Sequence, residues 1–202
     1  MSYNQFNIDK IKNDLGLAIS EKFELFADIT EAPYSGWLEE TLATNLPLAL
    51  AIATEKARSE MIVAPILIEL KKQAGEISLF SGRDFNVDEE KGLNGFCDFL
   101  VSRSVSQLAI EAPVLAIVEA KNDNLQSGFG QCMAEMYAAQ LFNERENNNI
   151  DTIYGSVTTG SLWQFMRLSG KAGKAIEIDL KEYPLNPGKI LGIFLSWLEI
   201  DN

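Results

Sequence analysis

The chain contains no histidine, and this absence removes several kinds of catalytic site. Ser-His-Asp and Cys-His systems need an imidazole as their base, and histidine-based zinc sites need it as a ligand. The chain also has only two cysteines, Cys97 and Cys132, which are too few for a four-thiolate metal site. A metal bound by this protein would therefore be held by carboxylate and carbonyl oxygens, which favour Mg²⁺, Mn²⁺ or Ca²⁺.

Signals for export and for membrane insertion are also missing. The apolar run at 62–70 is interrupted by Pro65 and Glu69 and is too short to span a bilayer. Residues 1–6 lack the basic and apolar blocks of a signal peptide, and two widely separated thiols are typical of a reducing compartment. We therefore expect a cytoplasmic protein with no membrane partner.

Basic residues are scarce. The 202 residues include 17 basic and 29 acidic ones, which gives a formal net charge of −12, and Lys71-Lys72 is the only adjacent basic pair. This balance argues against a protein that binds DNA through general electrostatic attraction. With 47% hydrophobic and 23% charged residues, the composition is that of a globular protein, and the length suits a single domain over 1–202.

The first third of the chain predicts helices. Apolar residues recur at helical spacing over three stretches, which are 8–26, 37–60 and 61–73. Pro47 is expected to interrupt the second stretch or to end a first segment of it. We assign residues 1–42 to an N-terminal helical extension.

The remainder of the chain alternates between strands and helices. The strand candidates are 77–80, 83–87, 95–102, 113–121, 152–157, 161–168 and 175–180. A long helix is expected at 124–143 and a closing helix at 187–200. The order indicates a mixed α/β chain with a strand–helix–strand unit in its middle, a core over 43–181 and a C-terminal helix within 182–202.

Charged residues stand inside the most apolar strand candidates. Asp98 is flanked by apolar residues, and Glu119 and Lys121 close the apolar run that starts at Val114. Alternate residues of a strand point to one face, so Glu119 and Lys121 share a face. If the strand of Asp98 pairs beside them, three charges meet at one place. Two buried carboxylates must then share a proton, pair with a cation or bind a metal.

This arrangement resembles the PD-(D/E)xK nuclease superfamily. The similar parts are the segment 95–98, a gap of about twenty residues and the segment 117–121, and the resemblance extends over about 43–181. It implies an α/β fold with a restriction-endonuclease-like αβββαβ core, in which helices flank a mixed central sheet. N-terminal and C-terminal helices would be added to that core, and no branch of the superfamily is assigned.

The resemblance also implies a metal site. Mg²⁺ or Mn²⁺ would be bound by Asp98 and Glu119, with the carbonyl of Ala120 as a further ligand. Glu60, on the helix that precedes the strands, would add a direct or water-bridged contact. Carboxylates and carbonyls are the ligands that these hard cations prefer.

Two further residues complete the implied catalytic site. Lys121 would orient the attacking water or stabilise developing negative charge, and Gln131 on the following helix would hold the water or the scissile phosphate. The implied activity is metal-dependent hydrolysis of the phosphodiester bonds of DNA. A homodimer or a partner protein could supply DNA contacts that this acidic chain lacks.

Each residue also has a structural interpretation. Asp98 alone could be a hydrogen-bonded structural acid, and Glu119 with Lys121 could be a salt bridge at a strand end. Glu60 and Gln131 could be ordinary helix positions.

Other residues near the motif are expected to be structural. Glu135, one turn after Gln131, is expected to be solvated. Trp163 and Phe165 are expected in the core, with base stacking as the alternative.

Two further functions compete with the nuclease. The first is a non-catalytic module of the same fold that acts as an interaction or structural protein, which the net charge favours. The second is a phosphatase-like or nucleotide-handling enzyme that uses the same carboxylates.

Overall fold

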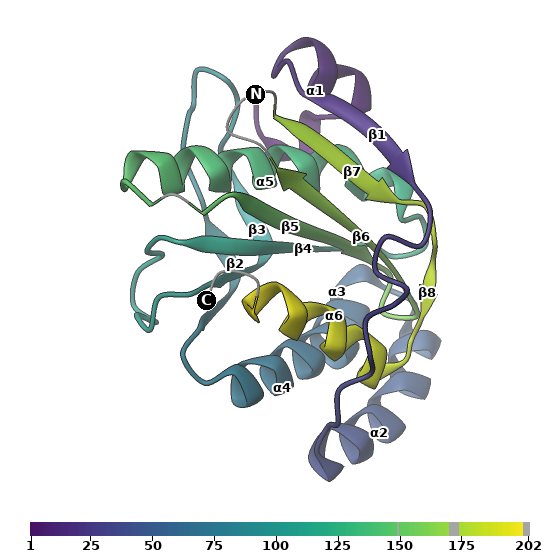
Figure 1. Cartoon of the computed structure of the whole chain (residues 1–202). Helices are drawn as coiled ribbons and strands as arrows, with labels where there is room; N and C mark the ends of the chain where they lie inside the picture. Colours follow the sequence, from purple (N-terminus) through teal and green to yellow (C-terminus); the bar gives the residue numbers. More distant parts are fainter. Residues whose placement is uncertain (149, 170–173, 200–202) are drawn as a thin grey trace.

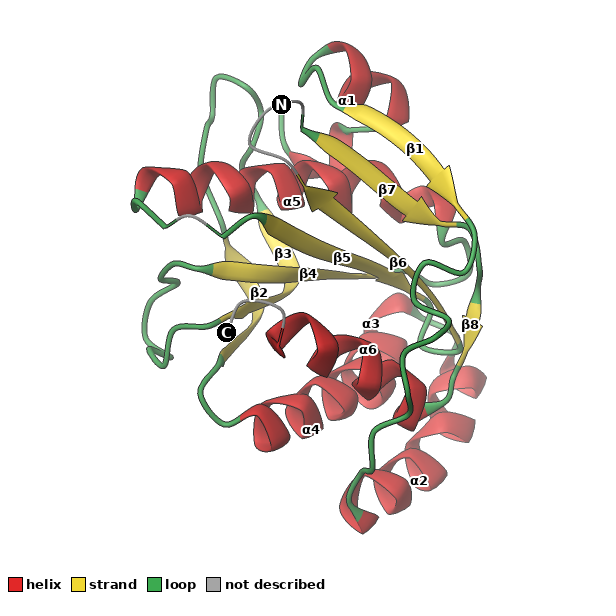
Figure 2. Cartoon of the chain, viewed as in Figure 1, coloured by secondary structure: helices red, strands yellow, loops and turns green. Residues whose placement is uncertain are grey.

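The protein, described here from a computed structural model, is built around a central sheet with helices on both faces (Figures 1 and 2). The structure describes residues 1–148, 150–169 and 174–199. Within these residues the strands form an eight-stranded mixed sheet. The predicted α/β class, with a mixed sheet flanked by helices, is confirmed.

The elements have the following bounds. The strands are β1 (Ala18–Lys22), β2 (Ser78–Asp84), β3 (Phe96–Ser102), β4 (Val114–Ala120), β5 (Thr152–Thr158), β6 (Leu162–Ser169), β7 (Ala175–Asp179) and β8 (Tyr183–Pro184). The helices are α1 (Ile8–Asn13), α2 (Gly36–Ile52), α3 (Glu55–Arg58), α4 (Ala64–Ala74), α5 (Gln126–Arg145) and α6 (Pro187–Glu199). A 3-10 turn, η1 (Tyr3–Gln5), precedes α1, and a π-helical turn, η2 (Ser59–Val63), joins α3 to α4.

The strand order is β1-β7-β6-β5-β4-β3-β2, and β8 pairs with β6 outside this path. β2, β3 and β4 are antiparallel neighbours, whereas β4 and β5 are parallel. A parallel pair needs a crossover connection, and α5 provides it. The predicted strand–helix–strand unit is therefore β4–α5–β5. All side chains of β4 are buried, as expected of a central strand covered on both faces.

Two hydrophobic cores lie on the two faces of the sheet. α5 and α1 cover one face, and α2, α4 and α6 cover the other (Figure 1). Successive residues of β4 enter different cores, Ile117 the first and Val118 the second. Trp163 and Phe165 are fully buried in the second core, as their structural interpretation predicts, so neither ring is open to a base.

The helix predicted over 8–26 is wrong beyond Asn13. Gly16 has a φ of +67°, which a helix does not accommodate, and the chain then enters β1. β1 is the edge strand of the sheet and pairs in parallel with β7, a strand more than 150 residues further along the chain. Segment 1–42 therefore contributes a strand to the sheet as well as helices, because tertiary pairing overrides the local pattern.

Two other features differ from the sequence prediction. Pro47 lies inside α2 without ending it, and the helix ends at Ile52, after which its C-cap Ala53 has a φ of +54°. Pro47 is exposed, so water can hydrate the carbonyl that loses its helical donor. The separate strand predicted at 83–87 is wrong, because β2 runs on through Gly82 to Asp84. The closing helix is confirmed as α6, and Ile200, its predicted end, lies outside the described residues.

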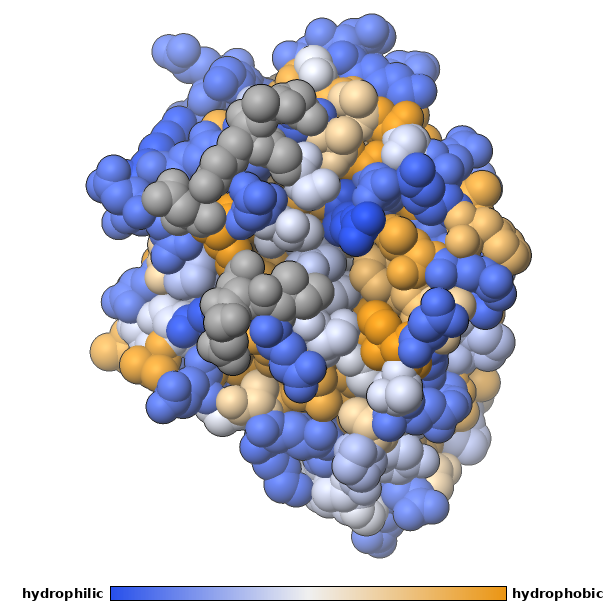
Figure 3. Space-filling view, in the orientation of Figure 1, coloured by the Kyte–Doolittle hydropathy of each residue, from blue (hydrophilic) through white to orange (hydrophobic). Residues whose placement is uncertain are grey.

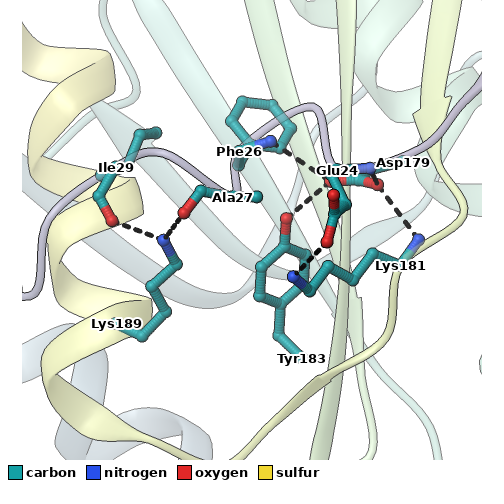
Figure 4. A network of polar contacts seen from close by, with 8 residues as sticks. All are labelled: Glu24, Phe26, Ala27, Ile29, Asp179, Lys181, Tyr183 and Lys189. Atoms are coloured by element: carbon teal, nitrogen blue, oxygen red, sulfur yellow. Dashed lines mark hydrogen bonds and ion pairs between the residues drawn. The ribbon is translucent and has the colours of Figure 1, made fainter.

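A polar network ties the segment after β1 to the end of β7 (Figure 4). The carboxylate of Asp179 is buried and accepts four hydrogen bonds. The donors are the backbone N–H groups of Glu24 (2.9 Å), Phe26 (3.3 Å) and Lys181 (3.0 Å) and the hydroxyl of Tyr183 (2.7 Å). The amine of Lys189, on α6, also donates to the carbonyls of Ala27 and Ile29. The network therefore has a structural role at the β1 side of the sheet.

Hydrophilic side chains cover most of the face shown in Figure 3, and apolar side chains form separate patches on it. Among the described residues, no helix combines the length and the apolar character needed to cross a membrane.

Candidate active site

A cavity of about 450 Å³ lies where β3 and β4 meet the N-terminal turn η1 and the helices α3 and α5. Its lining residues are Ser2, Tyr3, Asn4, Glu55, Gly95, Phe96, Asp98, Glu119, Lys121 and Gln131. Four residues predicted for the site, Asp98, Glu119, Lys121 and Gln131, therefore meet at one cavity although they come from two strands and a helix.

Asp98 lies where the backbone pairing of β3 with β4 ends. The last pair of residues in register is Phe99–Val118, and beyond it the Ala120 N–H donates to Oδ2 of Asp98 at 2.8 Å. The carboxylate thus takes the place of a strand carbonyl and is held against the end of β4. Burial raises the pKa of Asp98 above its usual value, although the Ala120 N–H and the Lys121 ammonium oppose this.

Glu119, on β4, and Lys121, directly after the end of β4, point into the same cavity, as strand alternation predicts. The Lys121 ammonium is 2.6 Å from Oε1 of Glu119, and the Lys121 N–H donates to the carbonyl of Thr158 on β5 at 2.8 Å. Burial and then the Asp98 charge raise the pKa of Glu119 to about 8, although Lys121 acts in the opposite direction. Burial, the largest single cause, would lower the pKa of Lys121, but the charge and hydrogen bond of Glu119 together with the charges of Glu55 and Asp98 raise that pKa overall.

One oxygen of Glu119 has no hydrogen-bond partner among the described residues. This atom, Oε2, is buried in a side chain that is only 1% exposed. A buried acceptor without a partner is costly, and a cation would satisfy it. Oε2 of Glu119 is therefore an oxygen atom that could coordinate a hard cation.

Glu135 lies behind the cavity and supports Gln131 by a hydrogen bond, which the sequence interpretation missed. It is fully buried, so the prediction that it is solvated is wrong. The Gln131 side-chain amide donates to Oε1 of Glu135 at 3.1 Å, while Oε2 is buried with no partner among the described residues. Burial, and then the charge of Glu119, raise the pKa of Glu135 well above its usual range. Glu135 lies on the same side of α5 as the apolar residues Cys132 and Met136, and this spacing in the sequence could have indicated that it is buried.

Glu60 lies apart from the main cavity. Its exposed carboxylate pairs with Lys56 at 2.6 Å and lines a neighbouring cavity of about 260 Å³, which Asp98 also borders. Glu55, unlike Glu60, lines both the main cavity and this neighbouring one. Thr54 caps α3 by accepting the Ala57 N–H at 3.2 Å, and this starts the helix with Glu55 facing the site.

The donor set fits Mg²⁺ or Mn²⁺ held by two carboxylates. Asp98 and Glu119 border the cavity together, and Mg²⁺ commonly uses one or two protein carboxylates and keeps several waters. Within the described ranges, no group of three or more Asp, Glu or Cys side chains is placed to hold a metal by itself. Water or the Ala120 carbonyl would therefore have to complete the coordination.

No family model and no curated protein matches the chain.

Proposed function

We propose that this protein is a metal-dependent nuclease with a restriction-endonuclease-like core. The elements α4, β2, β3, β4, α5 and β5 follow one another in the order αβββαβ. β2–β3 and β3–β4 are antiparallel and β4–β5 is parallel, which gives a mixed sheet around the candidate site. β1, β6, β7 and β8 would then be additions to that core.

The observation that carries this proposal is the meeting of Asp98, Glu119, Lys121 and Gln131 at one solvent-connected cavity. Neighbouring strands supply two carboxylates and an ammonium, and the buried Glu119 oxygen lacks a partner. This combination suits a cation and a phosphate ester better than it suits a closed structural ion pair.

The roles of the residues follow from their positions. When bound, Mg²⁺ or Mn²⁺ would polarise the phosphoryl group and lower the pKa of a coordinated water. Asp98 and Glu119 would hold the ion, with the Ala120 carbonyl as a further ligand and Glu60 or Glu55 within reach through water.

Lys121 and Gln131 would act on the substrate. The Lys121 ammonium lies beside the carboxylates and can stabilise negative charge that develops on the phosphate. The amide nitrogen of Gln131 is held by Glu135, which leaves its carbonyl oxygen to orient water or a polar group of the substrate.

Cleavage assays with site variants test this proposal. The wild type should cut single-stranded DNA or plasmid when Mn²⁺ or Mg²⁺ is present and should be inactive with EDTA. Lys121→Met should lower kcat at least 100-fold, because it removes the cation beside the phosphate, and it should keep metal binding, because both carboxylates that would hold the ion remain. The matched control is Asp84→Ala, which removes an exposed carboxylate from the neighbouring strand β2. This variant should cut DNA like the wild type. Intact substrate under all metal conditions would contradict the proposal.

A non-catalytic module is the second candidate. The 2.6 Å ion pair of Glu119 with Lys121 and the net charge of −12 favour it, because that pair can be structural and the charge repels nucleic acid. In that case Lys121→Met would destabilise the fold by leaving a buried carboxylate unpaired, and neither the wild type nor any variant would cleave DNA.

A further inference from the structure

Phe96 is an exposed aromatic residue at the mouth of the candidate site. Its side chain is 64% exposed, and it lines the same cavity as Asp98 and Gln131. A single exposed apolar residue is ordinary on a protein surface, but this ring borders a cavity whose other wall residues are largely polar or charged. The position of Phe96 at this cavity, rather than its exposure, suggests that its ring contacts a ligand.

The backbone fixes Phe96 beside the carboxylate. Phe96 lies two residues before Asp98 on β3, about 7 Å away along the strand, and both residues line the same cavity. Phe96 pairs with Asp84 of β2, and the preceding Gly95 donates its N–H to the Asn86 side chain at 2.9 Å. The ring is therefore attached to a rigid position although its faces remain open to solvent.

The N-terminal turn keeps this ring outside the core. Gly95 has a φ of +131°, and a Cβ at this position would lie 3.3 Å from the ring of Tyr3. Tyr3 is buried and its hydroxyl donates to the carbonyl of Phe85 at 2.6 Å. Because Tyr3 fills the inner side, Phe96 is the aromatic residue of this cavity that a ligand can reach.

Electrostatics restrict how a nucleic acid could be held here. Asp98, Glu119 and Glu55 line the cavity, and Lys121 is the one cation among its lining residues. Phosphate contacts alone are therefore a poor source of affinity. Stacking of a base on an aromatic ring does not depend on net charge and is available to any unpaired base.

We propose that Phe96 stacks on the unpaired base of a nucleotide that flanks the bound phosphate, and that the substrate class is single-stranded nucleic acid. In a duplex the bases already stack on each other, so the open faces of the ring would find no partner. This inference rests on the proposed function, because it assumes that a phosphodiester binds at Asp98 and Lys121.

The test compares two exposed phenylalanines. Phe96→Ala removes the ring at the cavity, and Phe23→Ala removes one that is 70% exposed just after β1, at the opposite edge of the sheet. For a single-stranded oligonucleotide, Phe96→Ala should raise KM about 10-fold, the size expected for losing one stacked base. Phe23→Ala should leave KM unchanged. The preference for this oligonucleotide over one of the same length that carries abasic sites, which have no base to stack, should fall by the same factor.

A binding measurement separates this inference from the proposed function. Fluorescence anisotropy of a labelled single-stranded oligonucleotide, with Ca²⁺ in place of Mg²⁺, reports affinity without cleavage. Phe96→Ala should weaken binding about 10-fold and Phe96→Trp should restore it. Binding that depends on Phe96, together with no cleavage under any condition, would overturn the nuclease and keep the stacking site. Equal affinity for wild type and Phe96→Ala, no binding at all, or equal dependence on Phe96 with duplex DNA would overturn the inference.

Discussion

Buried acids dominate the chemistry at the scale of single residues. Asp98, Glu119 and Glu135 all have a raised pKa, and in each case burial is the largest cause. Strand alternation allowed Glu119 and Lys121 to be placed together from the sequence. Glu135 was expected to be solvated because it is charged, but a helix that crosses between two parallel strands is buried on most of its sides, and only the position of Glu135 beside Cys132 and Met136 pointed to burial.

Glu135 should stabilise the fold through its hydrogen bond with Gln131. Glu135→Ala removes the acceptor of the Gln131 amide and leaves a void in the core, so we expect a loss of about 1–3 kcal/mol in the free energy of unfolding. Glu135→Gln keeps the shape and cannot ionise, so it should be at least as stable as the wild type at pH 8. Urea denaturation measures both. An Ala variant as stable as the wild type would contradict the burial of this residue.

The raised pKa values set the pH dependence of stability. An acid whose pKa is higher in the folded state keeps its proton after the unfolded chain has lost it, so folding becomes less favourable as the pH rises. For Glu119 this interval runs from about 4.5 to about 8. The melting temperature of the protein in EDTA should therefore fall between pH 5 and pH 8, and Glu119→Gln should reduce that slope. A wild-type melting temperature that rises across this interval would contradict the assignment.

At the scale of elements, long central segments were predictable and the edge of the sheet was not. β4, α5 and β5 have continuous apolar runs or a clear helical pattern, and the structure has all three. β1 has five residues with no alternation of buried and exposed positions, and it depends on a distant partner, β7. Glu55 was missed for a related reason, since the break at Ala53 changes which acid of the following turn faces the cavity.

The Asp179 network should stabilise this edge. Asp179→Ala leaves four donors without their acceptor, and we expect a loss of about 3 kcal/mol in the free energy of unfolding. Hydrogen exchange should show reduced protection at the amides of Glu24 and Phe26, which bond directly to the carboxylate. Exposed Asp28→Ala, in the same segment, is the control. Unchanged protection at Glu24 and Phe26 would show that the segment is held by other contacts.

At the scale of the whole molecule, the fold gathers polar groups from distant segments into one acidic cavity. Residues near positions 3, 55, 98, 120 and 131 line it, while the chain as a whole carries a net charge of −12. The convergence of Asp98, Glu119 and Lys121 followed from the strand pattern. The N-terminal turn as a wall of the cavity could not be predicted, because it packs against α5 through contacts about 130 residues apart in sequence.

Metal-dependent stabilisation tests the central claim most directly. Mn²⁺ or Mg²⁺ at about 100 times its Kd should raise the wild-type melting temperature by about 5–10 °C, because a ligand of the native state stabilises it. Asp98→Asn, which keeps an oxygen for the Ala120 N–H, should lose this shift, and Asp84→Ala should retain it. A wild type that neither ion stabilises, or an Asp98→Asn variant that shifts as much as the wild type, would contradict the account.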